Sequence, residues 1–292
     1  MKKLTAFLMM LALVASFSVM AQEAPATEEA APALETEETC DWRPFVSLSA
    51  DWATKYMCDG KVVNPNAMVF LDAFVELKGF YVDLWAAMDM SHYNRPDGGS
   101  FSYKNDRQYR AEEIDYVIGY NHTFDIFDFS PVKFDIAYKY FQYPRAYFDH
   151  DEPLDTTIAL TNILQSFQDE DAKDALSIGV TWRYDLNWYT NYFWFDTTYS
   201  RQLTDKLSAS ISGKLYWGTK SKMRAVYGLN RDVISSFQLK GALNYALTEN
   251  VSVGAWVDCG WAVDHEIRDA WKASDINNEE NFRTGVNVSF CF

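Results

Sequence analysis

The sequence predicts an all-β protein, a transmembrane up-and-down antiparallel β-barrel of about twelve strands. Three observations lead to this fold class. Apolar residues recur at every second position from residue 45 onward, charged residues concentrate on the alternate positions, and the chain ends on the alternating segment "TGVNVSFCF". In a soluble domain such a last strand would leave an unpaired edge that invites aggregation, whereas closure of a barrel removes the edge.

The N-terminal segment has the pattern of a secretory signal peptide. Lys2 and Lys3 precede an apolar run from Leu4 to Met20, followed by Ala21. A run of this length is at the lower limit for a membrane anchor, so we expect residues 1–21 to be cleaved on export. Residues 22–41 are rich in Ala, Pro and Glu, and this composition predicts a disordered acidic periplasmic tether. The barrel is expected to occupy residues 42–292.

Charge and hydropathy limit the partners that the chain can have. The formal net charge is −15, and removal of the two lysines of the signal makes the mature chain more negative still. This charge argues against a nucleic-acid partner and against a basic surface for anionic membranes. After the signal, the chain has no uninterrupted apolar run of the ~18 residues that a transmembrane helix needs. The expected partners are outer-membrane lipid, the barrel assembly machinery and small solutes, and no cofactor is expected.

The first strands show the alternation most clearly. In residues 45–56, Val46, Leu48 and Trp52 share one face with Tyr56, while Asp51 lies on the other. The same pattern recurs through the domain and is weakest in "LDTTIALTNIL". The expected strands are 45–56, 66–77, 80–90, 112–121, 132–142, 154–164, 176–185, 191–201, 207–217, 233–247, 251–261 and 282–292.

The two faces of these strands differ in a way that is typical of a membrane barrel. The apolar face has Ala, Gly, Val and Leu in the middle and aromatic residues toward the ends, whereas a soluble sandwich would need large residues throughout its core. The aromatic residues toward the ends are Trp52, Tyr56, Tyr120, Tyr138, Tyr140, Trp182, Trp217 and Trp261. The opposite face has the charges, which are candidate pore-lining residues: Asp51, Lys55, Asp72, Glu76, Asp83, Asp89, Glu113, Asp115, Lys133, Asp135, Lys139, Arg183, Asp185, Asp196, Lys214, Lys240, Asp258 and Arg283.

The connections alternate between short and long, as a barrel with both termini in the periplasm requires. Short turns are expected at 78–79, 202–206 and 247–250, and long extracellular loops at 91–110, 218–230 and 263–281. Two connections, 122–131 and 165–174, are long for periplasmic turns.

The C-terminus predicts how the barrel closes. We expect the last strand to pair with the first, and the alternating end with Phe290 and Phe292 to act as the insertion signal for the barrel assembly machinery. Cys40 and Cys291 would meet at this seam in an oxidising compartment, so a disulfide between them is one hypothesis. Free or differently paired thiols, including Cys58 and Cys259, remain alternatives.

A family resemblance covers most of residues 45–292. The segment "VSLSADWATKYMCDGKVVNPNAMVFLDAFVELKGFYVDLWAAMDMS" resembles the opening of the TorF-like porins, and the likeness continues in "EIDYVIGYNHTFD", "FDIAYKYFQYP" and "DALSIGVTWRYDL". The chain departs from the family in its acidic tether, its longer loop at 91–110 and its second-strand motif. The resemblance implies an outer-membrane barrel with no catalytic residues to transfer.

Three functions are compatible with these patterns. Because acids outnumber bases on the inward face, the sequence predicts a narrow, cation-preferring diffusion channel. The interleaved charges and the inward aromatic residues Phe70, Phe74, Trp85, Tyr192, Trp194 and Trp256 also fit a plugged structural or surface-interaction barrel. "FDHDE" and "DHE" place His150 and His265 beside carboxylates, which could serve a hydrolase or a divalent cation, but charged solvated loops are the simpler interpretation.

Overall fold

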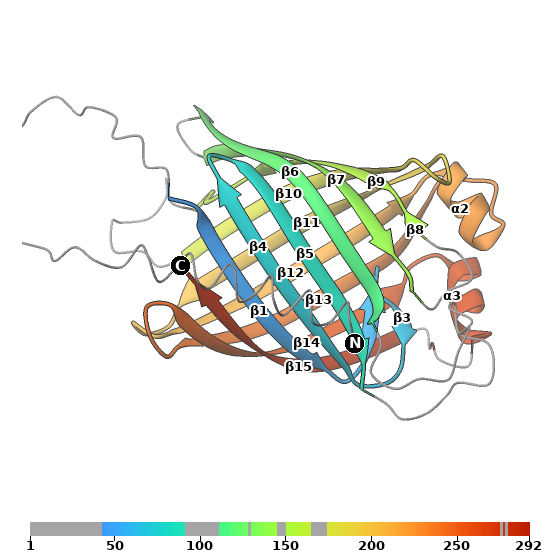
Figure 1. The fold of residues 1–292 in the computed structure, drawn as a ribbon. Helices are drawn as coiled ribbons and strands as arrows, with labels where there is room; N and C mark the ends of the chain where they lie inside the picture. Colours follow the sequence, from blue (N-terminus) through green and yellow to red (C-terminus); the bar gives the residue numbers. More distant parts are fainter. Residues whose placement is uncertain are drawn as a thin grey trace, which may run out of the picture.

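The chain forms a closed antiparallel β-barrel in a computed structural model, which describes residues 43–90, 111–127, 130–144, 150–164, 174–274, 277 and 280–292. Twelve long strands build the wall, and the two-residue strand β8 (His150–Asp151) pairs with the end of β7 just before β9 begins (Figure 1). The long strands are β1 (Phe45–Ala53), β4 (Met68–Leu77), β5 (Phe80–Asp89), β6 (Ala111–Phe127), β7 (Ser130–Gln142), β9 (Pro153–Leu160), β10 (Asp174–Asp185), β11 (Thr190–Gln202), β12 (Leu207–Gly218), β13 (Val233–Ala246), β14 (Val251–Ala262) and β15 (Glu280–Cys291).

The register closes the ring at the two ends of the chain. β1 pairs with β15 from Ser47 opposite Cys291 to Ala53 opposite Gly285. The amide N of Val46 donates to the carbonyl of Phe292 at 3.1 Å, and the amide N of Phe292 donates back at 2.9 Å. The expected seam between the first and last strands is therefore present, and the predicted fold class is confirmed.

Two boundaries differ from the sequence prediction for a physical reason. The predicted long turn at 122–131 is mostly strand, because β6 continues to Phe127 and pairs with β7 through Thr123 opposite Lys133 and Phe124 opposite Val132. Polar residues in this stretch interrupt the apolar pattern, and the register of the ladder shifts between Phe124 and Phe127, but the pairing of the two strands resumes at Phe127 opposite Ser130. β9 ends at Leu160 rather than at residue 164. Residues 91–110 and 165–173, two of the predicted connections, lie outside the described residues.

The first predicted strand is wrong beyond Ala53, because the chain leaves the wall there. β2 (Tyr56–Cys58) and β3 (Lys61–Asn64) form a separate two-stranded sheet, here called the mouth hairpin. Its turn residues Asp59 and Gly60 have φ values of 52° and 78°, the left-handed conformation that tight hairpins require and that an Asp-Gly pair favours. β1 itself ends earlier, at the bend of residues 54–55, where the chain leaves the wall to form this hairpin.

Because of the mouth hairpin, two residues do not lie on the faces predicted for them. Tyr56, predicted to face lipid, lies inside the barrel, where its hydroxyl donates to Glu113 at 2.6 Å and its ring packs edge-on to Phe70. Lys55, predicted to line the pore from a strand, lies instead in the bend between β1 and β2.

The tip of the mouth hairpin is anchored to the neighbouring strands β13 and β15. The hydroxyl of Ser236 donates to the carbonyl of Asp59 at 2.8 Å, and the side-chain amide of Asn281 donates to the carbonyl of Gly60 at 3.1 Å. Asn277 both accepts from the amide N of Val62 at 2.7 Å and donates to its carbonyl at 3.1 Å. The hairpin therefore reaches from β1 and β4 over part of the barrel mouth to β13–β15, the strands that follow β1 around the wall, and is held there by hydrogen bonds.

Two short helices, α2 (Lys220–Tyr227) and α3 (His265–Lys272), lie at the same end of the barrel as the mouth hairpin, opposite the C-terminus (Figure 1). Met223 and Ile267 from these helices pack with Trp271, Val233 and Ala262 in a small buried cluster. We call this end the helical rim and the other end, at Phe45 and Phe292, the terminal rim. Neither helix has the length or the apolar composition needed to cross a bilayer.

The N-terminus of α3 is stabilised by a charged cap. Asp264 accepts hydrogen bonds from the backbone N–H groups of Glu266 and Ile267. Arg231 donates to both Asp264 and Glu266 at 2.9 Å. Burial alone would raise the pKa of Asp264, but the hydrogen bonds from Arg231 and from the helix N–H groups outweigh it and lower the pKa.

This cap predicts an acid-sensitive helix. A carboxylate with a lowered pKa contributes stability above its unfolded pKa of about 3.9, and the contribution is lost as the pH falls through the folded value. We expect the protection of the α3 amides against hydrogen exchange, measured relative to the intrinsic exchange rate at each pH, to fall between about pH 4 and pH 2. Asp264→Asn keeps a capping side chain without the charge, and its exchange in α3 should depend less on pH over this range. An equal pH dependence in both proteins would contradict the assignment.

Candidate pore and its lining

The outside of the barrel is apolar where a bilayer would contact it. Val82, Ile118, Ile158, Ile211 and Val286 project outward from five strands, each about half exposed. Trp52, Tyr138, Trp182 and Trp217 are also exposed on this outer face. An apolar outer band with aromatic residues toward its edges is the surface that lipid stabilises.

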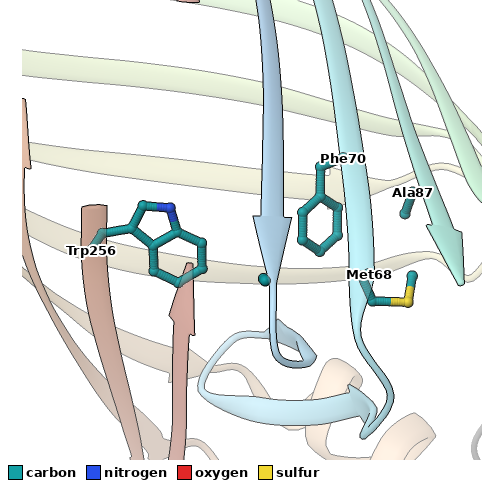
Figure 2. Packing of buried hydrophobic residues seen from close by; sticks show 5 residues of the cluster. Met68, Phe70, Ala87 and Trp256 are labelled. Carbon is teal, nitrogen blue, oxygen red and sulfur yellow. The ribbon is translucent and has the colours of Figure 1, made fainter. Parts of the chain in front are cut away.

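The inside contains a cavity of about 510 Å³ beneath the mouth hairpin. Met57, Cys58 and Asp59 of the hairpin contribute to its lining. Aromatic rings from the wall surround the cavity, among them Phe70, Trp85, Phe141, Tyr192, Trp194, Tyr216 and Trp256. Figure 2 shows two of these rings, Phe70 of β4 and Trp256 of β14, on either side of β1.

About half of the charged residues proposed from the sequence line this cavity. They are Asp51, Asp83, Glu113, Asp115, Lys139, Arg183, Lys214, Lys240 and Arg283. The others occupy inward positions elsewhere in the barrel: Asp72 opposite Trp85, Glu76 accepting from Asn121, Lys133 opposite Thr123, Asp135 accepting from Tyr81, Asp196 opposite Lys214, and Asp258 accepting from Arg283. Asp89 accepts from Asn64 and Asn66, and Asp185 accepts from the turn N–H groups of Asn187 and Trp188.

The strongest interaction in the lining involves a residue that the sequence analysis missed. Asp155 of β9 accepts two hydrogen bonds from Arg183, both at 2.6 Å, and forms an ion pair with Lys139 at 2.9 Å. The Asp155 side chain is 4% exposed, so this is a buried network. Asp155 lies in the segment with the weakest alternation, and its inward position became clear only from its pairing with β7 and β10.

A second network lies on β13–β15. Arg283 donates to Asp258 at 2.9 and 2.8 Å, and Gln238 donates to the same carboxylate oxygen at 2.7 Å. The Lys240 amino group and the Arg283 guanidinium lie 4.8 and 5.1 Å from the centre of the Trp256 ring, within cation–π range. The indole N–H of Trp256 in turn donates to Asp51 at 3.1 Å, which connects this network to β1.

The carboxylates of β5 and β6 are less fully paired. Glu113 accepts from Tyr56, as described above. One oxygen of Asp83 and one of Asp115 are buried without a hydrogen-bond partner in the described part of the chain. A buried polar atom left unpaired is costly, and such atoms mark positions where a bound group or water would be favoured.

The described histidines do not come together. His122 stacks on Tyr120 and packs edge-on to Phe124, and both rings share its face of β6. His150 forms a 3.2 Å pair with Glu152 and stacks on Tyr140, and His265 begins α3. Within the described ranges no group of three His, Cys, Asp or Glu side chains is arranged to hold a metal. His92 lies outside the described residues.

The C-terminal aromatic residues and the cysteines lie as follows. Phe290 and Phe292 are 37% and 48% exposed. The thiol of Cys291 lies 3.8 Å from the hydroxyl of Ser47. Cys40 is outside the described residues, so the disulfide between Cys40 and Cys291 stays a prediction. Among the described cysteines, Cys58, Cys259 and Cys291 are unpaired.

The known proteins that resemble this chain resemble it in fold and not in sequence. No protein-family model and no curated protein matches it. Its fold is similar to that of the KdgM porin (8% identity, 84% of this chain and 99% of that chain, TM-score 0.47) and of an outer membrane channel from Pseudomonas putida F1 (8%, 89% and 100%, 0.49). It is also similar to outer membrane phospholipase A from Escherichia coli (11%, 84% and 95%, 0.44). These similar structures include channels and an enzyme, and the resemblance of the chain to the TorF-like porins stays a prediction.

Proposed function

We propose that this chain is an outer-membrane barrel through which small solutes diffuse passively, with cations preferred. The observation that carries the proposal is the charged cavity inside a closed barrel with an apolar exterior. A barrel of twelve strands is narrower than the 16–18-stranded open porins, and the mouth hairpin narrows it further, so the solutes must be small. We assign the terminal rim to the periplasm, in keeping with the proposed signal peptide at 1–21 and the tether at 22–41.

The sign of the interior charge supports a preference for cations. Asp155 faces inward in addition to the acids identified from the sequence, and Lys55 does not project from a wall strand. The interior is therefore more acidic than the sequence analysis predicted. Low-dielectric walls concentrate the field of such charges, and carboxylates in a pore attract cations.

The test is the reversal potential of the purified, refolded protein in a planar bilayer under a potassium chloride gradient at low ionic strength. Potassium should carry most of the current, so the reversal potential should have the sign that makes the dilute side positive. At ~1 M salt the Debye length is ~3 Å, and the preference should weaken. An anion-selective reversal potential would contradict the electrostatic argument.

A plugged structural or surface-interaction barrel is the second candidate. The observation in its favour is the mouth hairpin, which lines the cavity and whose tip is held in place by bonds to Ser236 and Asn281. Complete absence of channels from protein that is folded in the bilayer would favour this candidate. A hydrolase has less support, because His150 and His265 belong to different elements and neither hydrogen-bonds a hydroxyl nucleophile among the described residues.

A further inference from the structure

The charges that line the cavity are separated by sign. The acids come from β1, β5, β6 and the mouth hairpin: Asp51, Asp83, Glu113, Asp115 and Asp59. The bases come from β7, β10, β12, β13 and β15: Lys139, Arg183, Lys214, Lys240 and Arg283. Among the described lining residues, neither group of strands contributes a charge of the other sign. The cavity therefore has an acidic wall and a basic wall.

The strand order places two parts of these walls directly opposite each other. β5 is separated from β12 by β6, β7, β9, β10 and β11 on one side, and by β4, β1, β15, β14 and β13 on the other. Counted around the same ring, β6 and β13 are likewise separated by five strands on each side and lie opposite each other. Asp83 and Asp115 on β5 and β6 thus face Lys214 and Lys240 on β12 and β13 across the cavity.

These four side chains have no ion-pair partner in the described part of the chain, although Lys240 also lies over the ring of Trp256. Arg183 and Arg283 are bonded to Asp155 and Asp258, whereas Lys214 and Lys240 have no carboxylate within ion-pair distance in the described part of the chain. Asp196 and Asp258 are their cross-strand neighbours, but neither lines the cavity. On the acidic wall, Asp83 and Asp115 each keep one buried oxygen without a partner.

We infer that the cavity binds a zwitterionic solute, an α-amino acid or a short peptide, during passage. The ammonium group of the solute is placed against Asp83 and Asp115, and its carboxylate against Lys214 and Lys240. Its apolar side chain packs on the rings of Trp85, Trp194 or Trp256. This inference rests on the proposed channel function and specifies the class of solute that the channel favours.

Size and charge complementarity both support this solute class. A volume of about 510 Å³ is within the range of small-molecule sites. A solute with one charge satisfies one wall only, and it leaves the opposite wall desolvated without a counter-charge. A zwitterion supplies both charges, and its dipole aligns with the field between the walls.

The experiment measures current block in single channels by glycylphenylalanine, which has both terminal charges and an aromatic ring. Its N-acetylated, C-amidated derivative has the same ring and backbone and no terminal charges. We expect the zwitterion to block at a concentration at least about tenfold lower than the neutral derivative. Derivatives blocked at one end only should fall between the two.

Substitutions in each wall then test whether both walls contribute to the current block. Two double variants are compared, Asp83→Asn with Asp115→Asn and Lys214→Gln with Lys240→Gln. Each should reduce the difference in blocking concentration between the zwitterion and the neutral derivative to less than about threefold. Lys206→Gln removes a base from an exposed turn at the terminal rim and serves as the matched control, with the difference unchanged.

The outcomes separate this inference from the proposed function. If channels form but glycylphenylalanine and its neutral derivative block equally, the zwitterion site is wrong and the channel stands. If a singly charged derivative blocks best, one wall dominates and the inference is likewise overturned. If folded protein forms no channels, the proposed function fails, and equilibrium dialysis of radiolabelled glycylphenylalanine against the detergent-solubilised barrel still tests the site.

Discussion

Asp155→Ala should destabilise the barrel by about 3–5 kcal/mol, more than any other single change considered for the wall. The substitution removes the carboxylate that accepts two hydrogen bonds from Arg183 and pairs with Lys139. Arg183 is largely buried among aromatic rings, including Phe141, Tyr192 and Trp194, so water in the cavity replaces only part of the lost interactions. Its uncompensated charge, rather than the loss of the carboxylate itself, dominates the cost.

The measurement is urea unfolding of the protein refolded into lipid vesicles, followed by tryptophan fluorescence. Glu249→Ala, at an exposed turn of the terminal rim, is the control and should change stability by less than about 0.5 kcal/mol. Addition of Arg183→Leu to Asp155→Ala should recover part of the loss, because the unpaired cation is then absent. A loss for Asp155→Ala no larger than that of the control would show that the network adds little.

Release of the mouth hairpin should raise single-channel conductance several-fold. Replacement of residues 55–66 by a short Gly-Ser turn removes Met57, Cys58 and Asp59 from the lining of the cavity. It also removes the hydrogen bonds that tie the hairpin to Ser236 and Asn281. Conductance depends on the narrowest section of a pore, and the hairpin lies over part of the barrel mouth above the cavity.

A point substitution tests the same feature with less disruption. A Cβ on Gly260 would overlap the backbone of Gly60, so Gly260→Ala should displace the hairpin tip and raise conductance or its fluctuations. Gly241→Ala on the adjacent strand β13 is the matched control, since its Cβ would meet only Val257 at an ordinary contact distance of 3.7 Å. Unchanged conductance in both the Gly260→Ala and the shortened-hairpin proteins would show that the hairpin does not limit the current.

The sequence predicted the strands of the barrel wall more accurately than the hairpin and the side-chain networks inside the barrel. The two-residue period predicted the wall strands, because one face contacts lipid and the other faces the interior, but it placed the ends of β1, β6 and β9 several residues from where they lie. The mouth hairpin was missed because Tyr56 continues the parity of β1, although the Asp59-Gly60 pair was a local turn signal that could have revealed it. The apolar parity alone cannot tell a ring that packs inside from one that faces lipid.

The internal side-chain networks could not be predicted from the sequence, for a different reason. Arg183 and Asp155 are on neighbouring strands, so their pairing requires the register between β9 and β10, which places them directly opposite each other. The separation of acids and bases into two walls likewise depends on which strands are opposite in the closed ring. A list of inward charges gives their sum, but not their arrangement.

Because β1 pairs with β15, the order of the strands along the chain could be changed without changing their order around the wall. Val46 and Phe292 exchange backbone hydrogen bonds, so the two ends of the barrel are neighbours in space. A circular permutant that joins them and opens the chain at the turn of residues 203–206 would keep every strand pair. Its chain would end on β11 instead of β15, so Phe290 and Phe292 would become internal residues. The stability of the folded ring and the proposed terminal signal for assembly are thus two independent properties, carried by the same strand only because the chain happens to end there.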